Sequence, residues 1–181
     1  MNPESNIKPD IIIVDDHLIF RQGLKAIINF EEVGSIIAEA STGEDFLALL
    51  PGLKPDLVLM DIDMPGMNGF DATKKALELI PDLKIIAFTV FSEEEYCTKM
   101  MKLGAKGFIL KSGGFNELEN AIKRVMKGEK YFTGYFQQEM NQEIDTKASL
   151  TDLENEDVSI KSNKKMSFFP WLVPKTNSIN T

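Results

Sequence analysis

LVLMDIDMPGMNG, residues 57–69, joins an apolar run to the start of a helix through a polar turn. Leu57–Met60 is short and wholly apolar, which is typical of a strand buried on both faces of a parallel sheet. Asn68-Gly69 is a helix-start signal, because asparagine often caps a helix N-terminus. Asp61 stands between the two, at the carboxyl end of the predicted strand. The stretch therefore predicts a strand, an acidic side chain at its end and then a helix.

The same strand-then-helix pattern occurs five times between residues 10 and 127. Consecutive units of this kind favour right-handed crossovers and a doubly wound α/β fold. We predict a five-stranded parallel sheet of order 2-1-3-4-5, with the strands numbered along the chain. The predicted strands are 11–14, 35–38, 57–60, 85–88 and 108–110, and the predicted helices lie near 18–30, 43–50, 69–80, 93–103 and 115–127.

The composition suits one globular domain with an appendage. The chain has 181 residues, of which 43% are hydrophobic and 27% charged. Its net charge of -8 argues against broad capture of nucleic acid or of anionic membrane. A single cysteine, Cys97, and a single histidine, His17, exclude an intramolecular disulfide, a cysteine-cluster zinc site and a two-histidine protease motif. We interpret His17 as a helix-start residue that lies near the predicted site.

Targeting signals are not recognisable in the sequence. No apolar stretch approaches the roughly 18 residues of a membrane span. Residues 1–9 form a polar N-terminal tail without the apolar core of a signal peptide. We therefore expect a cytoplasmic protein without membrane attachment. Along the chain we expect a domain at 10–128, a linker at 129–149 and a separate tail at 150–181.

Polar side chains follow four of the five predicted strands. The carboxyl ends of parallel strands meet at one edge of the sheet, where ligands bind. Asp15, Asp16 and Asp61 follow neighbouring strands and should converge. Three carboxylates this close resist ionisation unless a cation sits among them, and oxygen ligands in a small acidic pocket favour Mg²⁺. Thr89 adds a hydroxyl and Lys111 a positive charge, so the group can stabilise a phosphoryl group on one carboxylate.

Four motifs together resemble the receiver domain of two-component response regulators. They are VDDH at 14–17, LVLMDIDMPGMNG at 57–69, AFTVFS at 87–92 and GAKGFILKS at 104–112. They stand in the family's order and spacing over about residues 9–128, and the combination is specific although no single motif is. The resemblance implies a flavodoxin-like receiver fold and a partner sensor histidine kinase.

The resemblance also implies a role for each matched residue. Asp61 would accept the phosphoryl group from a phosphohistidine of the kinase. Asp16 and Asp61 would ligate Mg²⁺ directly, together with the backbone carbonyl of Asp63, and Asp15 would act through water. Lys111 would pair with the phosphoryl oxygens.

Two further residues would carry the signal away from the site. Thr89 would hydrogen-bond a phosphoryl oxygen, and the rotamer of Phe108 would follow Thr89. This movement would remodel the face formed by 93–103, 108–110 and 115–127, and the resemblance allows a homodimer through the same face. We expect the protein to catalyse only its own phosphorylation and dephosphorylation and to be no enzyme otherwise.

The tail carries fragments of a DNA-binding module. The motifs VDDH and GAKGFILKS are typical of regulators with a LuxR-type helix-turn-helix output module, and Leu150-Thr151-Asp152, Ser162-Asn163-Lys164 and Pro174-Lys175-Thr176 resemble parts of it. Four helices of the usual 11–12 residues need more than the 32 residues at 150–181, and prolines interrupt them. We predict a truncated or degenerate, poorly ordered remnant and expect no intact DNA binding.

Two alternative functions stay open. One is a DNA-binding transcriptional regulator whose C-terminal module still folds. The other is a Mg²⁺-dependent phosphohydrolase, which needs a second acid/base aspartate beside its nucleophile. Asp63 has that spacing from Asp61. The Asp15-Asp16 pair and the placement of Thr89 and Lys111 favour the receiver.

Overall fold

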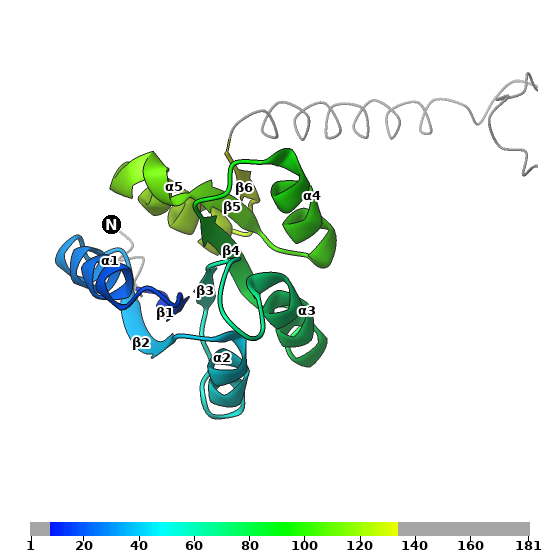
Figure 1. Cartoon of the computed structure of the whole chain (residues 1–181). Helices are drawn as coiled ribbons and strands as arrows, with labels where there is room; N and C mark the ends of the chain where they lie inside the picture. The colour runs from blue at the N-terminus through cyan, green and yellow to red at the C-terminus, as the bar shows by residue number, and fades with distance from the viewer. Residues whose placement is uncertain (1–7, 134–181) are drawn as a thin grey trace, which may run out of the picture. The chain divides into compact units, whose positions relative to one another are not determined.

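The computed structural model describes residues 8–133, which form a parallel sheet between two layers of helices (Figure 1). The sheet has the order β2-β1-β3-β4-β5-β6, and every neighbouring pair is parallel. The strands are β1 (Asp10–Val14), β2 (Ser35–Ala40), β3 (Leu57–Met60), β4 (Lys84–Thr89), β5 (Gly107–Leu110) and β6 (Tyr131–Phe132). The helices are α1 (Leu18–Phe30), α2 (Gly43–Leu49), α3 (Gly69–Leu79), α4 (Glu94–Leu103) and α5 (Gly114–Met126), with 3-10 turns η1 (Leu50–Gly52) and η2 (Lys111–Gly113).

The two helix layers cover opposite faces of the sheet, with α1 and α5 on one face and α2, α3 and α4 on the other (Figure 1). Successive side chains of a strand point to opposite faces, so each central strand contributes to both cores. The strand residues packed with α1 and α5 are Ile11, Ile13, Leu57, Leu59, Ile86, Phe88 and Ile109. Those packed with the other layer are Ile12, Val14, Val58, Met60, Ile85, Ala87 and Phe108. Burial on both faces explains the apolar runs of these central strands.

The predicted fold is confirmed with its five strands and their order, and the structure adds a sixth short strand at the edge of the sheet. The sixth strand, β6, lies in the segment 129–149 that the sequence indicated as a linker. Phe132 pairs with Phe108 of β5 and is 1% exposed. The N–H of Thr133 donates to the carbonyl of Phe108 over 3.0 Å. A two-residue strand is too short to show a period in the sequence, so only its packing reveals it.

The start of α3 fixes the loop that follows β3. The Asn68 side chain accepts the N–H of Asp71 over 3.0 Å, which confirms the predicted cap. The N–H of Gly69 donates to the carbonyl of Ile62 over 2.9 Å. A Cβ on Gly69 would lie 2.0 Å from the backbone oxygen of Asp61. Only glycine therefore lets α3 begin this close to Asp61.

None of the helices within residues 8–133 combines the length and the apolarity that crossing a bilayer requires. The predicted tail at 150–181 and most of the predicted linker lie outside the described residues.

Candidate functional site

Asp15 and Asp61 leave the sheet side by side. In the register of β1 and β3, Val14 pairs with Met60, and the two aspartates are the next residues of their chains. The N–H of Asp61 donates to the carbonyl of Val14 over 2.8 Å, which continues the ladder one step beyond the strands. Their exposed fractions are 2% for Asp15 and 4% for Asp61. The sheet therefore fixes two buried carboxylates at the edge where ligands bind in folds of this kind.

Lys111 bridges these two buried carboxylates from the end of β5. Its Nζ lies 2.6 Å from Oδ2 of Asp15 and 2.6 Å from Oδ2 of Asp61, and its side chain is only 9% exposed. The same Nζ lies 4.6 Å from the centre of the Phe20 ring of α1. Charges buried together are screened little by water. Lys111 therefore offsets the repulsion between the two aspartates.

Burial raises the pKa of Asp61 above its ordinary value of 3.8. The hydrogen bond and the charge of Lys111 lower this pKa, the charge of Asp15 raises it again, and the N–H of Ile62, which donates to Oδ1 over 2.7 Å, lowers it. The loss of hydration is the largest of these effects, so the net change is upward. A carboxylate with a raised pKa is a stronger base than an exposed aspartate and, once ionised, a better nucleophile.

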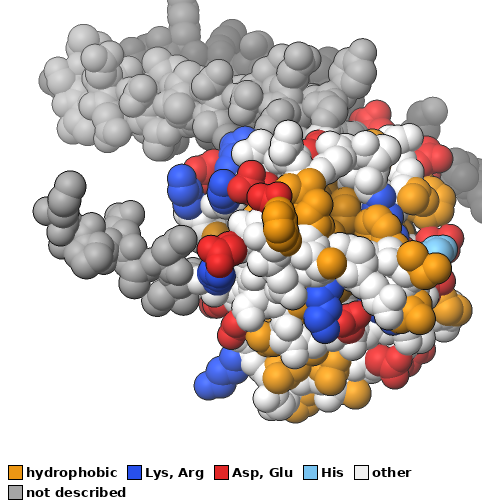
Figure 2. Space-filling view, turned by 90° about the vertical axis from the view of Figure 1, so that its left-hand side faces the viewer, with side chains coloured by type: hydrophobic (Ala, Val, Ile, Leu, Met, Phe, Trp, Pro, Cys, Tyr) orange, Lys and Arg blue, Asp and Glu red, His pale blue; other side chains and the backbone are white. Residues whose placement is uncertain are grey.

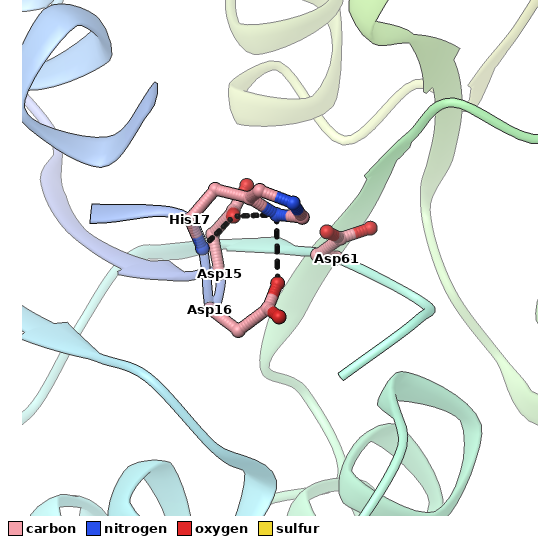
Figure 3. Close-up of side chains that lie close together, drawn as sticks. All are labelled: Asp15, Asp16, His17 and Asp61. Atoms are coloured by element: carbon pink, nitrogen blue, oxygen red, sulfur yellow. Dashed lines mark hydrogen bonds and ion pairs between the residues drawn. The ribbon is translucent and has the colours of Figure 1, made fainter. Parts of the chain in front are cut away.

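Asp16 and His17 line the same space as the two buried aspartates (Figure 3). The His17 Nδ1 lies 2.8 Å from Oδ1 of Asp16 and 3.4 Å from Oδ1 of Asp15. Asp15, Asp16, His17 and Asp61 each place one ligand atom so that all four atoms lie within 4.8 Å of one another. His17 is the N-cap residue of α1, as the predicted helix start near the site requires, and the structure adds that its imidazole lines the site itself. Its position next to Asp15-Asp16 is the signal that points to it.

The donor set at this edge of the sheet fits a hard divalent cation such as Mg²⁺. Three carboxylates face a single ammonium, that of Lys111, so the cluster keeps an excess of negative charge. Oδ1 of Asp16 is buried and receives no hydrogen bond from any residue between 8 and 133. A buried oxygen without a donor is unfavourable unless a cation or water meets it. Oxygen ligands with access to water match the coordination that Mg²⁺ prefers.

The remaining predicted residues lie around this cluster. Thr89 ends β4 and is fully buried, and its Oγ1 accepts the N–H of Phe91 over 3.4 Å. The side chain of Asp63 is exposed, and its carboxylate is not among the four groups that converge. Phe108 is 3% exposed and packs with Cys97 and other side chains of the core beneath α4. The structure thus unites Asp15, Asp16, Asp61 and Lys111, whereas the roles assigned to these residues and to Thr89, Asp63 and Phe108 stay predictions.

A parallel sheet with buried acids and a lysine at its carboxyl edge defines a doubly wound α/β domain with a candidate ligand site at that edge. Residues 11–123 match the family model described as response regulator receiver domain. The chain therefore belongs to the response regulator receiver family.

The chain's relatives include LuxR-family response regulators. It is 38% identical over 130 residues to the response regulator GacA of Pseudomonas aeruginosa, covering 72% of this chain and 61% of GacA. It is 37% identical over 132 residues to the transcriptional regulatory protein DegU of Brevibacillus brevis, covering 72% and 56%. The match therefore spans about three fifths of the length of these curated relatives.

Solved structures give the same result. A LuxR-family two-component response regulator from an Aurantimonas species superposes with a TM-score of 0.69 at 29% identity, covering 75% of this chain and 97% of that one. The isolated receiver domain of RcsB from Salmonella enterica serovar Typhimurium, in the presence of the phosphomimetic BeF3−, superposes with a TM-score of 0.65 at 26% identity, covering 70% and 94%.

Proposed function

We propose that this receiver domain accepts a phosphoryl group on Asp61 from a phosphohistidine of a sensor histidine kinase. The observation that carries the proposal is the position of Asp61, a buried carboxylate of raised pKa that the Lys111 ammonium touches at 2.6 Å. Asp15 and Asp16 complete an acidic cluster around it. The comparisons, which place the chain among receivers, favour this function over a phosphohydrolase.

The transfer is a substitution at phosphorus. A carboxylate oxygen of Asp61 forms the new P–O bond while the P–N bond to the donor imidazole breaks, and the released imidazole nitrogen keeps the bonding electron pair and takes up a proton from water. Asp16 and Asp61 would hold Mg²⁺, whose charge offsets that of the phosphoryl oxygens when it is bound. The carbonyl of Asp63 and a water on Asp15 would complete the set.

Lys111 and Thr89 would respond to the new charge. A phosphoryl group on Asp61 adds negative charge within reach of the Lys111 ammonium, so this ammonium exchanges one of its carboxylate partners for a phosphoryl oxygen. The hydroxyl of Thr89 would donate to another phosphoryl oxygen and give up its contact with the N–H of Phe91. The loop before α4 would then move, Phe108 would follow Thr89, and the surface of α4, β5 and α5 would change.

The first turn of α1 supports a docking surface for the kinase. Leu18 and Ile19 follow the site directly and are exposed, Ile19 at 84%. Ile19 and Phe20 line a groove that Phe115 of α5 closes from the other side. Figure 2, which faces the side of the domain where α1 lies in Figure 1, shows hydrophobic side chains gathered among charged ones. A kinase helix packed here would bring its phosphohistidine to the opening above Asp61.

Intact-mass measurement tests the acceptor. The full chain treated with acetyl phosphate and Mg²⁺ should gain one phosphoryl group. Asp61→Asn should gain none, whereas Asp63→Asn, which changes the exposed aspartate two residues away, should gain one as the wild type does. Labelling of Asp61→Asn equal to that of the wild type would refute the proposal. Steady turnover of small phosphomonoesters that depends on Asp63 would support the phosphohydrolase instead.

We place the protein in the cytoplasm and expect no catalysis beyond its own phosphorylation and dephosphorylation. Homodimer formation through the α4, β5 and α5 surface and a degenerate helix-turn-helix remnant at 150–181 stay predictions, and the latter segment lies outside the described residues.

A further inference from the structure

We infer that His17 is an additional ligand of the cation in this site and makes the site prefer transition metals, Co²⁺ and Ni²⁺ in particular, over Mg²⁺. The inference rests on the proposed function, because the same carboxylates hold the ion. The receiver motifs give His17 no role, and the three carboxylates could hold a cation without it.

The distances around His17 are those of neighbouring ligands of one ion. With metal–ligand bonds of about 2.1 Å, adjacent corners of an octahedron are about 3.0 Å apart and opposite corners about 4.2 Å. The His17 Nδ1 lies 2.8 Å from Oδ1 of Asp16 and 3.4 Å from Oδ1 of Asp15. All four ligand atoms of the cluster, including one of Asp61, lie within 4.8 Å of one another. A small contraction brings the atoms of Asp16, His17 and Asp61 onto one cation, which Asp15 would reach through a water.

The short contact between His17 and Asp16 is not a hydrogen bond. Although only 2.8 Å separates the two atoms, Oδ1 of Asp16 has no hydrogen-bond donor among residues 8–133. The two atoms lie at ion-pair distance and can share a third partner. A cation between them would satisfy the buried oxygen and use the lone pair of a neutral imidazole.

The backbone holds His17 in this position independently of its side chain. Its N–H donates to Oδ1 of Asp15 over 2.8 Å, and its carbonyl accepts the N–H of Arg21 in the first turn of α1 over 3.0 Å. The imidazole makes no capping hydrogen bond to the helix. It is 70% exposed, so its second nitrogen reaches water. The ring therefore lies at the rim of the site and does not cap α1.

A nitrogen ligand changes which ion the site selects. Mg²⁺ favours oxygen ligands and water, whereas imidazole suits Ni²⁺, Co²⁺ and Zn²⁺, whose affinities exceed that of Mn²⁺ in the usual order. A set of carboxylates alone would bind Mg²⁺ and Mn²⁺ through the same oxygens. Adding His17 should strengthen the binding of Co²⁺ and Ni²⁺ while it leaves that of Mg²⁺ nearly unchanged.

Calorimetric titration of the full chain with Mg²⁺ and with Co²⁺ tests the inference, using the wild type and His17→Ala. Alanine is suitable because the side chain caps nothing in α1. We expect His17→Ala to weaken Co²⁺ binding by roughly tenfold or more and Mg²⁺ binding by less than about threefold. Pulsed electron paramagnetic resonance with Mn²⁺ should detect coupling to a ring nitrogen in the wild type and lose it in His17→Ala.

The outcomes separate this inference from the proposed function. Equal weakening of both ions, or no weakening of Co²⁺, overturns the role of His17, and phosphorylation of the wild type at Asp61 with Mg²⁺ would then still support the receiver function. Failure of the wild type to bind either ion overturns the inference, and failure to label Asp61 in the same preparation refutes the function as well. Asp16→Asn serves as the control that should weaken both ions.

Discussion

Asp61 is a carboxylate whose burial opposes its charge. Its pKa lies above 3.8 even though Lys111 touches it. A group whose pKa is higher in the folded state than in the unfolded chain binds more protons when folded. The stability of the fold therefore falls as the pH rises from about the unfolded pKa through the folded pKa of Asp61. The ionised carboxylate of the proposed acceptor therefore lowers the stability of the fold near neutral pH.

Replacement of this acid should stabilise the fold near neutral pH. We expect Asp61→Asn to have a larger free energy of unfolding than the wild type at pH 7, because the amide carries no charge to bury. The difference should shrink as the pH falls toward 3.8, where the wild-type carboxyl becomes protonated in both states. Urea unfolding at a series of pH values measures it. A difference that grows toward acid pH would contradict the raised pKa.

At the same scale, the positions of the site residues could be predicted because each one ends a strand. Asp15, Asp16 and Asp61 follow β1 and β3, and adjacent parallel strands deliver them to one edge. The place of His17, and that of Phe20 over Lys111, depends instead on the direction in which α1 leaves the loop. No local pattern encodes that direction, so the sequence could place His17 near the site but could not reveal these contacts.

At the scale of elements, the close approach of the first residue of α3 to Asp61 fixes the loop between β3 and α3. Gly69→Ala should destabilise the fold by about 1–3 kcal/mol, because its Cβ would collide with the backbone oxygen of Asp61. It should also slow phosphorylation, since that backbone must move. Gly23→Ala is the matched control, because its Cβ meets nothing within 4 Å and it lies inside α1. Alanine there should stabilise by about 0.5–1 kcal/mol.

Chemical unfolding and the rate of labelling by acetyl phosphate check both variants. Gly69→Ala with wild-type stability and rate would show that the loop tolerates a methyl group and that the close approach is not needed.

The edge strand β6 is short, but its packing should contribute to the stability of the fold. Phe132 is 1% exposed and packs in the cluster that contains Phe108. We expect Phe132→Ala to cost about 3–5 kcal/mol, the usual loss for a buried phenylalanine. Phe30→Ala is the control, because Phe30 is 82% exposed and its loss should change the stability by less than about 0.5 kcal/mol. Equal effects of the two substitutions in denaturant titrations would place β6 outside the cooperative unit.

For the whole molecule, the apolar runs in the sequence predict the fold only where such runs occur. The apolar runs of β1, β3 and β4 are buried on both faces and most of the β5 run is too, whereas the run of the edge strand β2 is only partly buried. The apolar composition of the five runs predicts a doubly wound sheet without knowledge of any contact. β6 could not be predicted, because two residues are too few to show the alternation of side chains along a strand. Its pairing with β5 extends the packed domain to Thr133, beyond the predicted end at 128. Packing against β5, which lies far back along the chain, decides this boundary.

The burial of Cys97 gives a test of the integrity of this packed domain. Loss of hydration, together with the charge of Glu94, raises the pKa of its thiol to about 12. Only the thiolate reacts readily with disulfide reagents. We expect no reaction of the folded chain with such a reagent at pH 8 and rapid reaction in denaturant. Rapid reaction without denaturant would mean that α4 opens from the sheet.

The central claim is that the domain carries its phosphoryl group on Asp61. Borohydride reduces a phosphorylated aspartate to homoserine, so peptide sequencing by mass spectrometry after acetyl phosphate, Mg²⁺ and borohydride locates the acceptor directly. Our account predicts homoserine at position 61 and unmodified aspartate at positions 15, 16 and 63. Homoserine at any of those three positions in place of 61, or none in the chain, would contradict it.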